Sequence, residues 1–214
     1  MDGTDSPSVP AETEDPERVA YLLDILSSVG SVLLVGALLF AISGVWPPLV
    51  AVESSSMEPN VGKGDMVFVM TEQRFAGPQA THGVVTAQQA DGYTRFENSG
   101  DVIVYEPDGN ERRTPVIHRA MLWVDAGENW YDRADQDAIG AADDCQELRN
   151  CPAPHAGFIT KGDNERTNGA YDQVSGISGV VRPTWVVGTA ELRVPLLGEV
   201  RLQWNQAGRT VAVT

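Results

Sequence analysis

Lysine is almost absent from this sequence of 214 residues: Lys63 and Lys161 are the only two, and the other basic residues are arginine. There are 30 acidic residues against 15 basic ones, so the formal net charge is −15. Nucleic-acid binding is therefore not expected, because contact with phosphates needs a basic surface. An acidic, lysine-poor composition is typical of proteins that work in very high salt, where screening reduces self-repulsion. An acidic face that binds a partner is the alternative.

Charged residues are missing altogether from Ile25 to Val52. The apolar stretch up to Trp46 would span roughly 33 Å as a helix, at about 1.5 Å per residue, which is enough to cross a bilayer. We therefore expect a transmembrane anchor over residues 22–46, stopped by Pro47 and Pro48. Trp46 would then lie where an interfacial aromatic residue belongs.

Two other interpretations of this segment compete with an anchor. A cleaved secretory signal would end near Ala41-Ile42-Ser43, but such signals have a shorter apolar run and a basic region before it. A buried core helix would need a polar second face, which the segment lacks. Residues 1–20 are rich in proline, serine, threonine and acid, and we expect them to form a disordered tail. Because this tail is acidic, the positive-inside rule indicates no orientation.

Short β-type runs separated by turn signals follow the apolar segment. Residues 47–60 are expected to bridge to a mostly β domain, and 71–99 and 125–156 are expected to be insertions. Met66–Met70 is apolar throughout, which predicts a strand buried on both faces. The expected strands are 65–70, 83–87, 101–105, 116–124, 157–161, 179–187 and a last run over 188–203 that Pro195 interrupts.

Cysteine is also scarce. Cys145 and Cys151 are the only two, and His155 follows them closely. A small disulfide-closed loop is the preferred interpretation if this part of the chain lies outside the membrane. Two free thiols, or a zinc site that includes His155, are the alternatives, although the spacing fits no familiar zinc motif.

Three short motifs carry side chains suited to chemistry. The segment Ser54-Ser55-Ser56-Met57-Glu58-Pro59 follows the apolar run by about ten residues, so its hydroxyls would lie near a bilayer surface. His118 lies on an expected strand, and neutral imidazole is a suitable base near neutral pH. Gly162-Asp163-Asn164 comes after another strand, with Asp172 and Glu165 as the downstream acids. Taken singly, the three motifs would read as a linker, a structural histidine and a turn.

In this order the three motifs resemble those of the type I signal peptidases, in the archaeal and endoplasmic-reticulum branch that uses histidine where bacterial enzymes use lysine. The resemblance covers roughly residues 25–200 apart from the two insertions. It implies that Ser56 is the nucleophile, that Ser54 donates to the oxyanion and that His118 is the general base. It leaves two candidates for the orienting carboxylate, of which Asp172 is preferred over Asp163.

The resemblance further implies a β peptidase domain over residues 47–214 that cleaves signal peptides after small residues, without metal or organic cofactor. Its partners would be precursor proteins, the lipid bilayer and the secretion translocon. The N-terminus would be cytoplasmic and the domain extracytoplasmic, because exported proteins emerge on the outer side. Two alternatives stay open. A self-cleaving repressor-type peptidase would need a Ser–Lys dyad with Lys63 or Lys161, and an inactive anchored β-domain would only bind.

Overall fold

The computed structural model describes residues 16–195. The chain divides into two units, residues 1–41 and 42–214, and each is considered by itself. Helix α1 (Pro16–Ser43) accounts for the first unit and the two residues after it. Its stretch Glu17–Ser43 is long and apolar enough for a single membrane pass, and a signal sequence near an N-terminus can also meet this criterion of length and hydropathy.

Both ends of α1 differ from the expected 22–46. The helix begins at Pro16, where the fixed φ of proline suits a first helical position. It ends at Ser43 because Gly44 adopts a φ of +74°, the left-handed conformation that commonly terminates helices. Residues 16–20 of the expected disordered tail are therefore helical, and the remainder of that tail lies outside the described residues.

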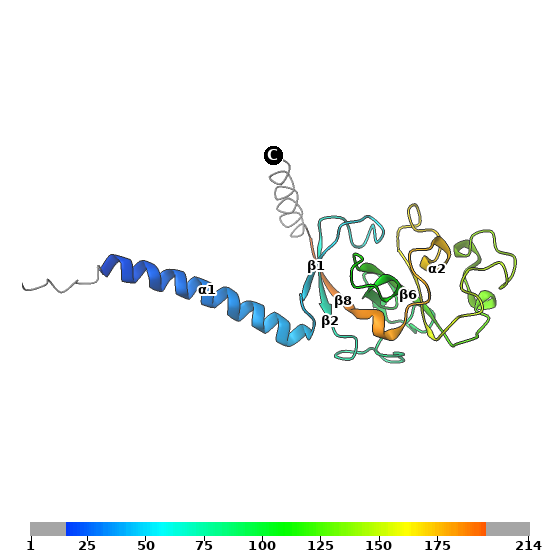
Figure 1. Ribbon diagram of the computed structural model, residues 1–214, viewed down its shortest axis with the longest axis horizontal. Helices are drawn as coiled ribbons and strands as arrows, with labels where there is room; N and C mark the ends of the chain where they lie inside the picture. Colours follow the sequence, from blue (N-terminus) through cyan, green and yellow to red (C-terminus); the bar gives the residue numbers. More distant parts are fainter. Residues whose placement is uncertain (1–15, 196–214) are drawn as a thin grey trace, which may run out of the picture. The chain divides into compact units, whose positions relative to one another are not determined.

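The second unit is built on one antiparallel sheet of six strands in the order β1-β2-β8-β5-β6-β7 (Figure 1). The mostly β fold expected from the sequence is thus confirmed. The strands are β1 (Leu49–Ala51), β2 (Met66–Met70), β5 (Val102–Tyr105), β6 (Val116–Val124), β7 (Gly157–Lys161) and β8 (Val186–Val194). A separate hairpin joins β3 (Thr94–Arg95) to β4 (Asn98–Ser99), and the short helices are α2 (Asp172–Ser175) and the 3-10 turns η1 (Pro107–Gly109), η2 (Tyr131–Arg133), η3 (Gln136–Ala138) and η4 (Pro183–Trp185).

Three expectations about strands were wrong. Strand β1 lies inside the segment 47–60 that was expected to be only a bridge. Residues 83–87 form no strand, because the N–H of Val85 donates to the Asp101 carboxylate (2.8 Å) instead of to a neighbouring strand. The expected strand 179–187 is interrupted by η4, which begins at Pro183, and β8 starts only at Val186. Residues beyond 195, including the end of the expected last run, lie outside the described residues.

The segment 125–156 is compact although it has little regular structure. It contributes Trp130, Ile139 and Leu148 to a buried cluster with Leu122 of β6 and with Tyr171, the residue before α2. Cys145 and Cys151 form a disulfide in this segment, as preferred from the sequence. Among residues 16–195 no group of side chains is arranged to hold a metal ion, and His155 bonds to the carbonyl of Ala156.

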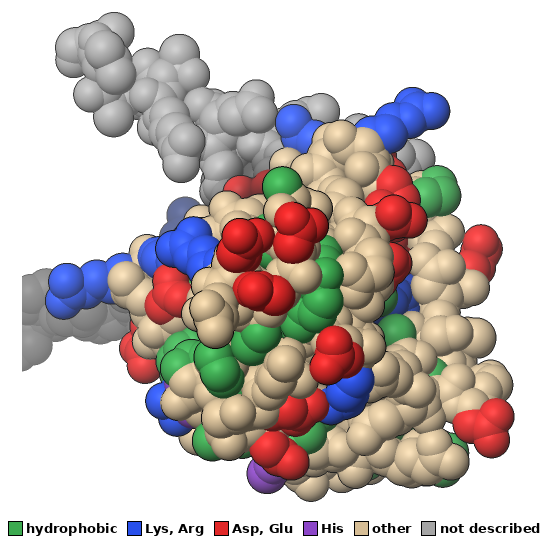
Figure 2. All heavy atoms as spheres, turned by 90° about the vertical axis from the view of Figure 1, so that its right-hand side faces the viewer, with side chains coloured by type: hydrophobic (Ala, Val, Ile, Leu, Met, Phe, Trp, Pro, Cys, Tyr) green, Lys and Arg blue, Asp and Glu red, His purple; other side chains and the backbone are tan. Residues whose placement is uncertain are grey.

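Acidic side chains are spread over the face of the domain shown in Figure 2 and do not gather into one patch there. Several acids elsewhere are buried and paired, among them Asp65 with Arg193 (2.7 Å) and Asp163 with Arg119. The acidic charge on this face (Figure 2) therefore consists of separate, solvated groups, an arrangement that salt screens effectively.

Candidate active site

The register of three neighbouring strands brings polar side chains onto one face of the sheet. His118 of β6 pairs with Ile103 of β5, and Tyr105 lies two residues further along β5 on the same face. Thr160 of β7 pairs with Ala120, which lies two residues after His118. Because side chains alternate between the faces of a sheet, Tyr105, His118 and Thr160 all project to the same side.

Asp172, the first residue of α2, lies over this face and is fully buried. Its two carboxylate oxygens lie 2.9 and 2.8 Å from Nδ1 of His118, which is itself only 3% exposed. The hydroxyls of Tyr105 and Thr160 donate to Oδ2 of Asp172 over 2.8 and 2.6 Å. Burial, together with the negative charge of Asp172, raises the pKa of Tyr105 well above 10, so its hydroxyl stays protonated as a donor. Because Nδ1 is bonded to Asp172, Nε2 is the ring nitrogen of His118 that is available to accept a proton.

Ser56 reaches the same region from the loop after β1. The side-chain oxygens of Ser54 and Ser56 lie 3.0 Å apart and form a hydrogen bond. The following residue, Met57, is buried in a cluster with Val52 and Val61, which fixes the loop to the domain core. The backbone N–H of Ser56 has no acceptor among residues 16–195.

The Gly162-Asp163-Asn164 motif packs against the backbone of this loop and binds it through hydrogen bonds. Asn164 donates its backbone N–H to the carbonyl of Ser56 (2.9 Å) and its side-chain amide to the carbonyl of Ser55 (2.8 Å). A Cβ on Gly162 would lie 2.6 Å from the Ser56 carbonyl oxygen, closer than real Cβ contacts allow. Glycine and asparagine are therefore needed at these positions to set the backbone of Ser56.

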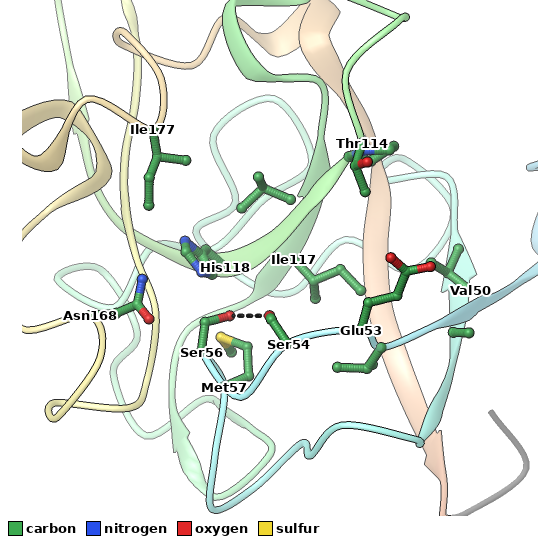
Figure 3. A pocket seen from close by; sticks show the side chains of 14 residues that line it. Val50, Glu53, Ser54, Ser56, Met57, Thr114, Ile117, His118, Asn168 and Ile177 are labelled. Atoms are coloured by element: carbon green, nitrogen blue, oxygen red, sulfur yellow. Dashed lines mark hydrogen bonds between the residues drawn. The ribbon is translucent and has the colours of Figure 1, made fainter. Parts of the chain in front are cut away.

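A cleft of about 620 Å³ exposes the reactive groups. Ser54, Ser56 and His118 all line it. Figure 3 shows the hydroxyls of Ser54 and Ser56 directed toward each other, with His118 near Ser56 in this view, Ile177 and Asn168 on one side, and Glu53 and Thr114 on the other. Most of the remaining wall is apolar and is formed by Val50, Ala51, Val52, Met57, Pro115, Val116 and Ile117. The cleft thus has serine hydroxyls and a histidine in a largely apolar wall.

The second candidate carboxylate has a different partner. Asp163 accepts two hydrogen bonds from the Arg119 guanidinium (2.7 and 2.5 Å), and it also accepts one from Asn98 (3.1 Å). Arg119 follows His118 directly, so its side chain projects from the opposite face of β6. The structure therefore brings Asp172, and not Asp163, together with His118.

Neither lysine lines the cleft. Lys161 pairs with Arg119 across β6 and β7, which places it on the face opposite His118, and its ammonium bonds to Glu165 (2.5 Å). Lys63 is exposed. A Ser–Lys dyad thus has no geometric support in the described part of the chain.

Tyr105 and Thr160 were not predicted from the sequence as site residues, and Asn164 was named only as part of the Gly162-Asp163-Asn164 motif, without a role. A signal for the first two was present, since period-two alternation puts Tyr105 and Thr160 on the His118 face once the strand register is known. The register itself could not be read from one sequence.

Comparison of the chain with protein-family models and with curated protein sequences gave no match. Evidence for a function therefore comes from the geometry of Ser56, His118 and Asp172.

Proposed function

We propose that this chain is a membrane-anchored serine endopeptidase that removes N-terminal signal peptides from exported precursors by cleavage after small residues. One observation carries the proposal: Ser56 and His118 line one cleft, while a buried carboxylate, Asp172, occupies the other nitrogen of the imidazole. A serine hydroxyl, a histidine base and an orienting carboxylate are the parts that acyl transfer by serine requires.

In the acylation step, Oγ of Ser56 attacks the carbonyl carbon of the scissile peptide bond, and Nε2 of His118 takes its proton. Asp172 holds the Nδ1–H tautomer of His118 and stabilises the imidazolium that forms. Ser54, whose hydroxyl lies 3.0 Å from Oγ of Ser56, and the free N–H of Ser56 are suited to donate to the oxyanion. Each such donor lowers the barrier by about 3 kcal/mol.

Collapse of the tetrahedral intermediate breaks the C–N bond, and His118 gives its proton to the leaving amine. The mature protein leaves with this new N-terminus, and the signal peptide stays on Ser56 as an ester. Water then attacks the ester carbonyl with His118 again as base. This step releases the signal peptide with a free carboxylate and restores the Ser56 hydroxyl.

The shape of the cleft favours an extended, apolar substrate segment. Strand β1 lies at the edge of the sheet, and its residues Val50 and Ala51 line the cleft. An unpaired strand edge can bind an extended peptide through backbone hydrogen bonds. The apolar wall near Ile117 suits small apolar side chains and offers no partner for a buried charge. Helix α1 would retain the enzyme at the bilayer, where signal peptides reside.

The proposal is tested with the full chain in lipid vesicles at high salt. We expect it to cleave a precursor with an N-terminal signal, to leave a small residue at the new C-terminus and to be acylated on Ser56 by a serine-reactive probe, each checked by mass spectrometry. Failure of both cleavage and acylation in folded protein would favour the alternative, an anchored β-domain that only binds.

A further inference from the structure

The carboxylate of Asp172 lies in a fully buried site and depends on hydroxyl donors. Tyr105 and Thr160 direct their hydroxyls to the same oxygen, Oδ2, and neither residue is exposed to solvent. Bulk solvent therefore does not reach this carboxylate. Removal of a carboxylate from water favours its neutral form unless hydrogen bonds to the charged form compensate. A protonated Asp172 would neither orient the Nδ1–H of His118 nor stabilise an imidazolium.

One of the two donors, Thr160, is itself fixed by the buried amide of Gln173. Oε1 of Gln173 accepts the backbone N–H of Thr160 (3.0 Å), and Nε2 of Gln173 donates to the carbonyl of Gly179 (3.0 Å). The same amide nitrogen lies within hydrogen-bond distance of Oγ1 of Thr160 (3.4 Å). Because this oxygen accepts from Gln173, its own proton is directed to Asp172.

We propose that Tyr105 and Thr160 are positioning residues that keep Asp172 ionised and turned toward Nδ1 of His118. This inference rests on the proposed function for its catalytic consequence. Its electrostatic part concerns only how the His118 and Asp172 pair takes up a proton, and that can be measured without any substrate.

Within residues 16–195, the other charged groups near this pair are themselves paired. Asp108 contributes to the negative field at Tyr105, and it is paired with Arg113 at 2.7 Å. On β6 and β7, Arg119 and Lys161 lie next to the site in sequence but project from the opposite face of the sheet, as described above. Their charges are matched by Asp163 and Glu165. The hydroxyl donors are thus the groups whose removal changes the pair most directly.

Removal of one hydroxyl donor should change the pH at which the His118 and Asp172 pair takes up a proton, and the direction of this change can be predicted. The carboxylate becomes more basic, and this destabilises the state with neutral histidine more than the state in which the pair holds an extra proton. The pair should therefore take up its proton at a higher pH, whichever of the two residues holds it. We expect the titration midpoint to rise by about 0.5–1 pH unit in Tyr105→Phe and in Thr160→Val, since hydrogen bonds to charged groups are stronger than neutral ones.

The experiment is a pH titration of ¹⁵N-histidine signals in the full chain in lipid nanodiscs, at high salt and without substrate. The sequence has three histidines, so His82 and His155 serve as internal references. Thr160→Ser keeps the hydroxyl and should keep the wild-type midpoint. Tyr93→Phe is the matched control, because Tyr93 also donates to a carboxylate, Asp101, over 2.8 Å, and it does not line the cleft.

Kinetics supply the second readout. We expect kcat to fall about tenfold in Tyr105→Phe and Thr160→Val with KM nearly unchanged, because positioning of the base acts on the transition state. If the His118 midpoint moves no more in these variants than in Tyr93→Phe, the inference is wrong even when wild type cleaves precursors. If the midpoint shifts but wild type cleaves nothing, the proposed function fails and the electrostatic role stands.

Discussion

Nδ1 of His118 lies 2.8 Å from Oδ2 of Asp172, although the two residues are 54 positions apart in the sequence. The next residue after His118, Arg119, faces the other side of the sheet and binds Asp163. Two adjacent residues of β6 therefore bind two different carboxylates on opposite faces of the sheet. Replacement of Asp172 and replacement of Asp163 should for this reason have different effects.

Ser56→Ala should abolish precursor cleavage, because it removes the proposed nucleophile from the cleft. Ser55→Ala is the control, since Ser55 is bound through its backbone carbonyl by Asn164 and its side chain does not line the cleft. Ser54→Ala should lower kcat about 10²-fold with little change in KM, the usual effect of losing one oxyanion donor. The readout is the rate of precursor processing in vesicles. Normal processing by Ser56→Ala would rule out the assignment of the nucleophile.

Asp172→Asn should lower kcat by about 10⁴-fold. The same exchange in a well-known serine protease has an effect of this size, because the histidine then adopts the wrong tautomer. Asp163→Asn should instead act on stability. Arg119 and Asp163 are 3% and 4% exposed, and loss of the carboxylate charge leaves a buried guanidinium without its counter-ion. We expect a loss of about 3 kcal/mol in the free energy of unfolding.

Both aspartate variants are compared at high salt by denaturant unfolding and by cleavage rate. High salt is needed because the net charge of −15 would otherwise add repulsion that obscures the comparison. A stable, inert Asp163→Asn together with an active Asp172→Asn would reverse the two assignments.

The sequence allowed the mostly β fold to be predicted because β-type runs such as Met66–Met70 and Val116–Val124 carry strong apolar patterns. It could not reveal β1, whose three residues lie between a proline pair and a serine run. The sequence also suggested a strand at 83–87, because Val84 and Val85 are apolar. The two residues are buried, but they lie at the end of a turn, where the N–H of Val85 donates to Asp101. Local apolar composition reports burial, but the hydrogen-bond partner decides the secondary structure.

The candidate site shows the same division. Ser56 and His118 were recognisable from local motifs, whereas the choice between Asp172 and Asp163 depended on which face of β6 each residue meets. Tyr105 and Thr160 could not be found at all without the register of β5 and β7 against β6. Contacts between residues far apart in the chain are set by strand pairing, and a single sequence does not contain that information explicitly.

The disulfide should contribute to stability and not to catalysis. Replacement of Cys145 and Cys151 by serine should lower the free energy of unfolding by about 2 kcal/mol, the loop-entropy value for so short a loop. Neither cysteine lines the cleft, so kcat/KM should stay within about twofold of wild type. Denaturant unfolding and precursor cleavage of the double variant give the two readouts. A loss of cleavage in a variant that remains folded would show that the segment 125–156 contributes to the reaction.

Stability should fall at alkaline pH because burial raises the pKa of three tyrosines, Tyr93, Tyr105 and Tyr171, of which the first two are replaced in the test variant. Burial raises the pKa of Tyr93 to about 12, and burial with the charge of Asp172 raises the pKa of Tyr105 well above 10. The folded protein keeps phenol protons that the unfolded chain releases near pH 10, so their contribution is complete below pH 10 and is lost as pH rises through the folded-state values. In denaturant unfolding, the Tyr93→Phe, Tyr105→Phe double variant should show a smaller drop between pH 9 and 11 than wild type. An equal drop would point to other groups.

Glu53 should make the cleft selective for charge. Among the described residues that line the cleft, it is the only one with an Asp, Glu, Lys or Arg side chain, and it precedes Ser54 directly (Figure 3). Matched substrates should be cleaved about twofold to fivefold faster with lysine than with glutamate at the position facing Glu53, and a scan of that exchange along the cleavage region identifies the position. Glu53→Gln should remove the preference, whereas Glu58→Gln, an equal charge change at an exposed residue outside the cleft, should keep it. Because the interaction is between exposed charges, the preference should also shrink as salt concentration rises. A preference that is the same in Glu53→Gln and wild type, or one that does not respond to salt, would mean that the carboxylate of Glu53 does not contact the substrate.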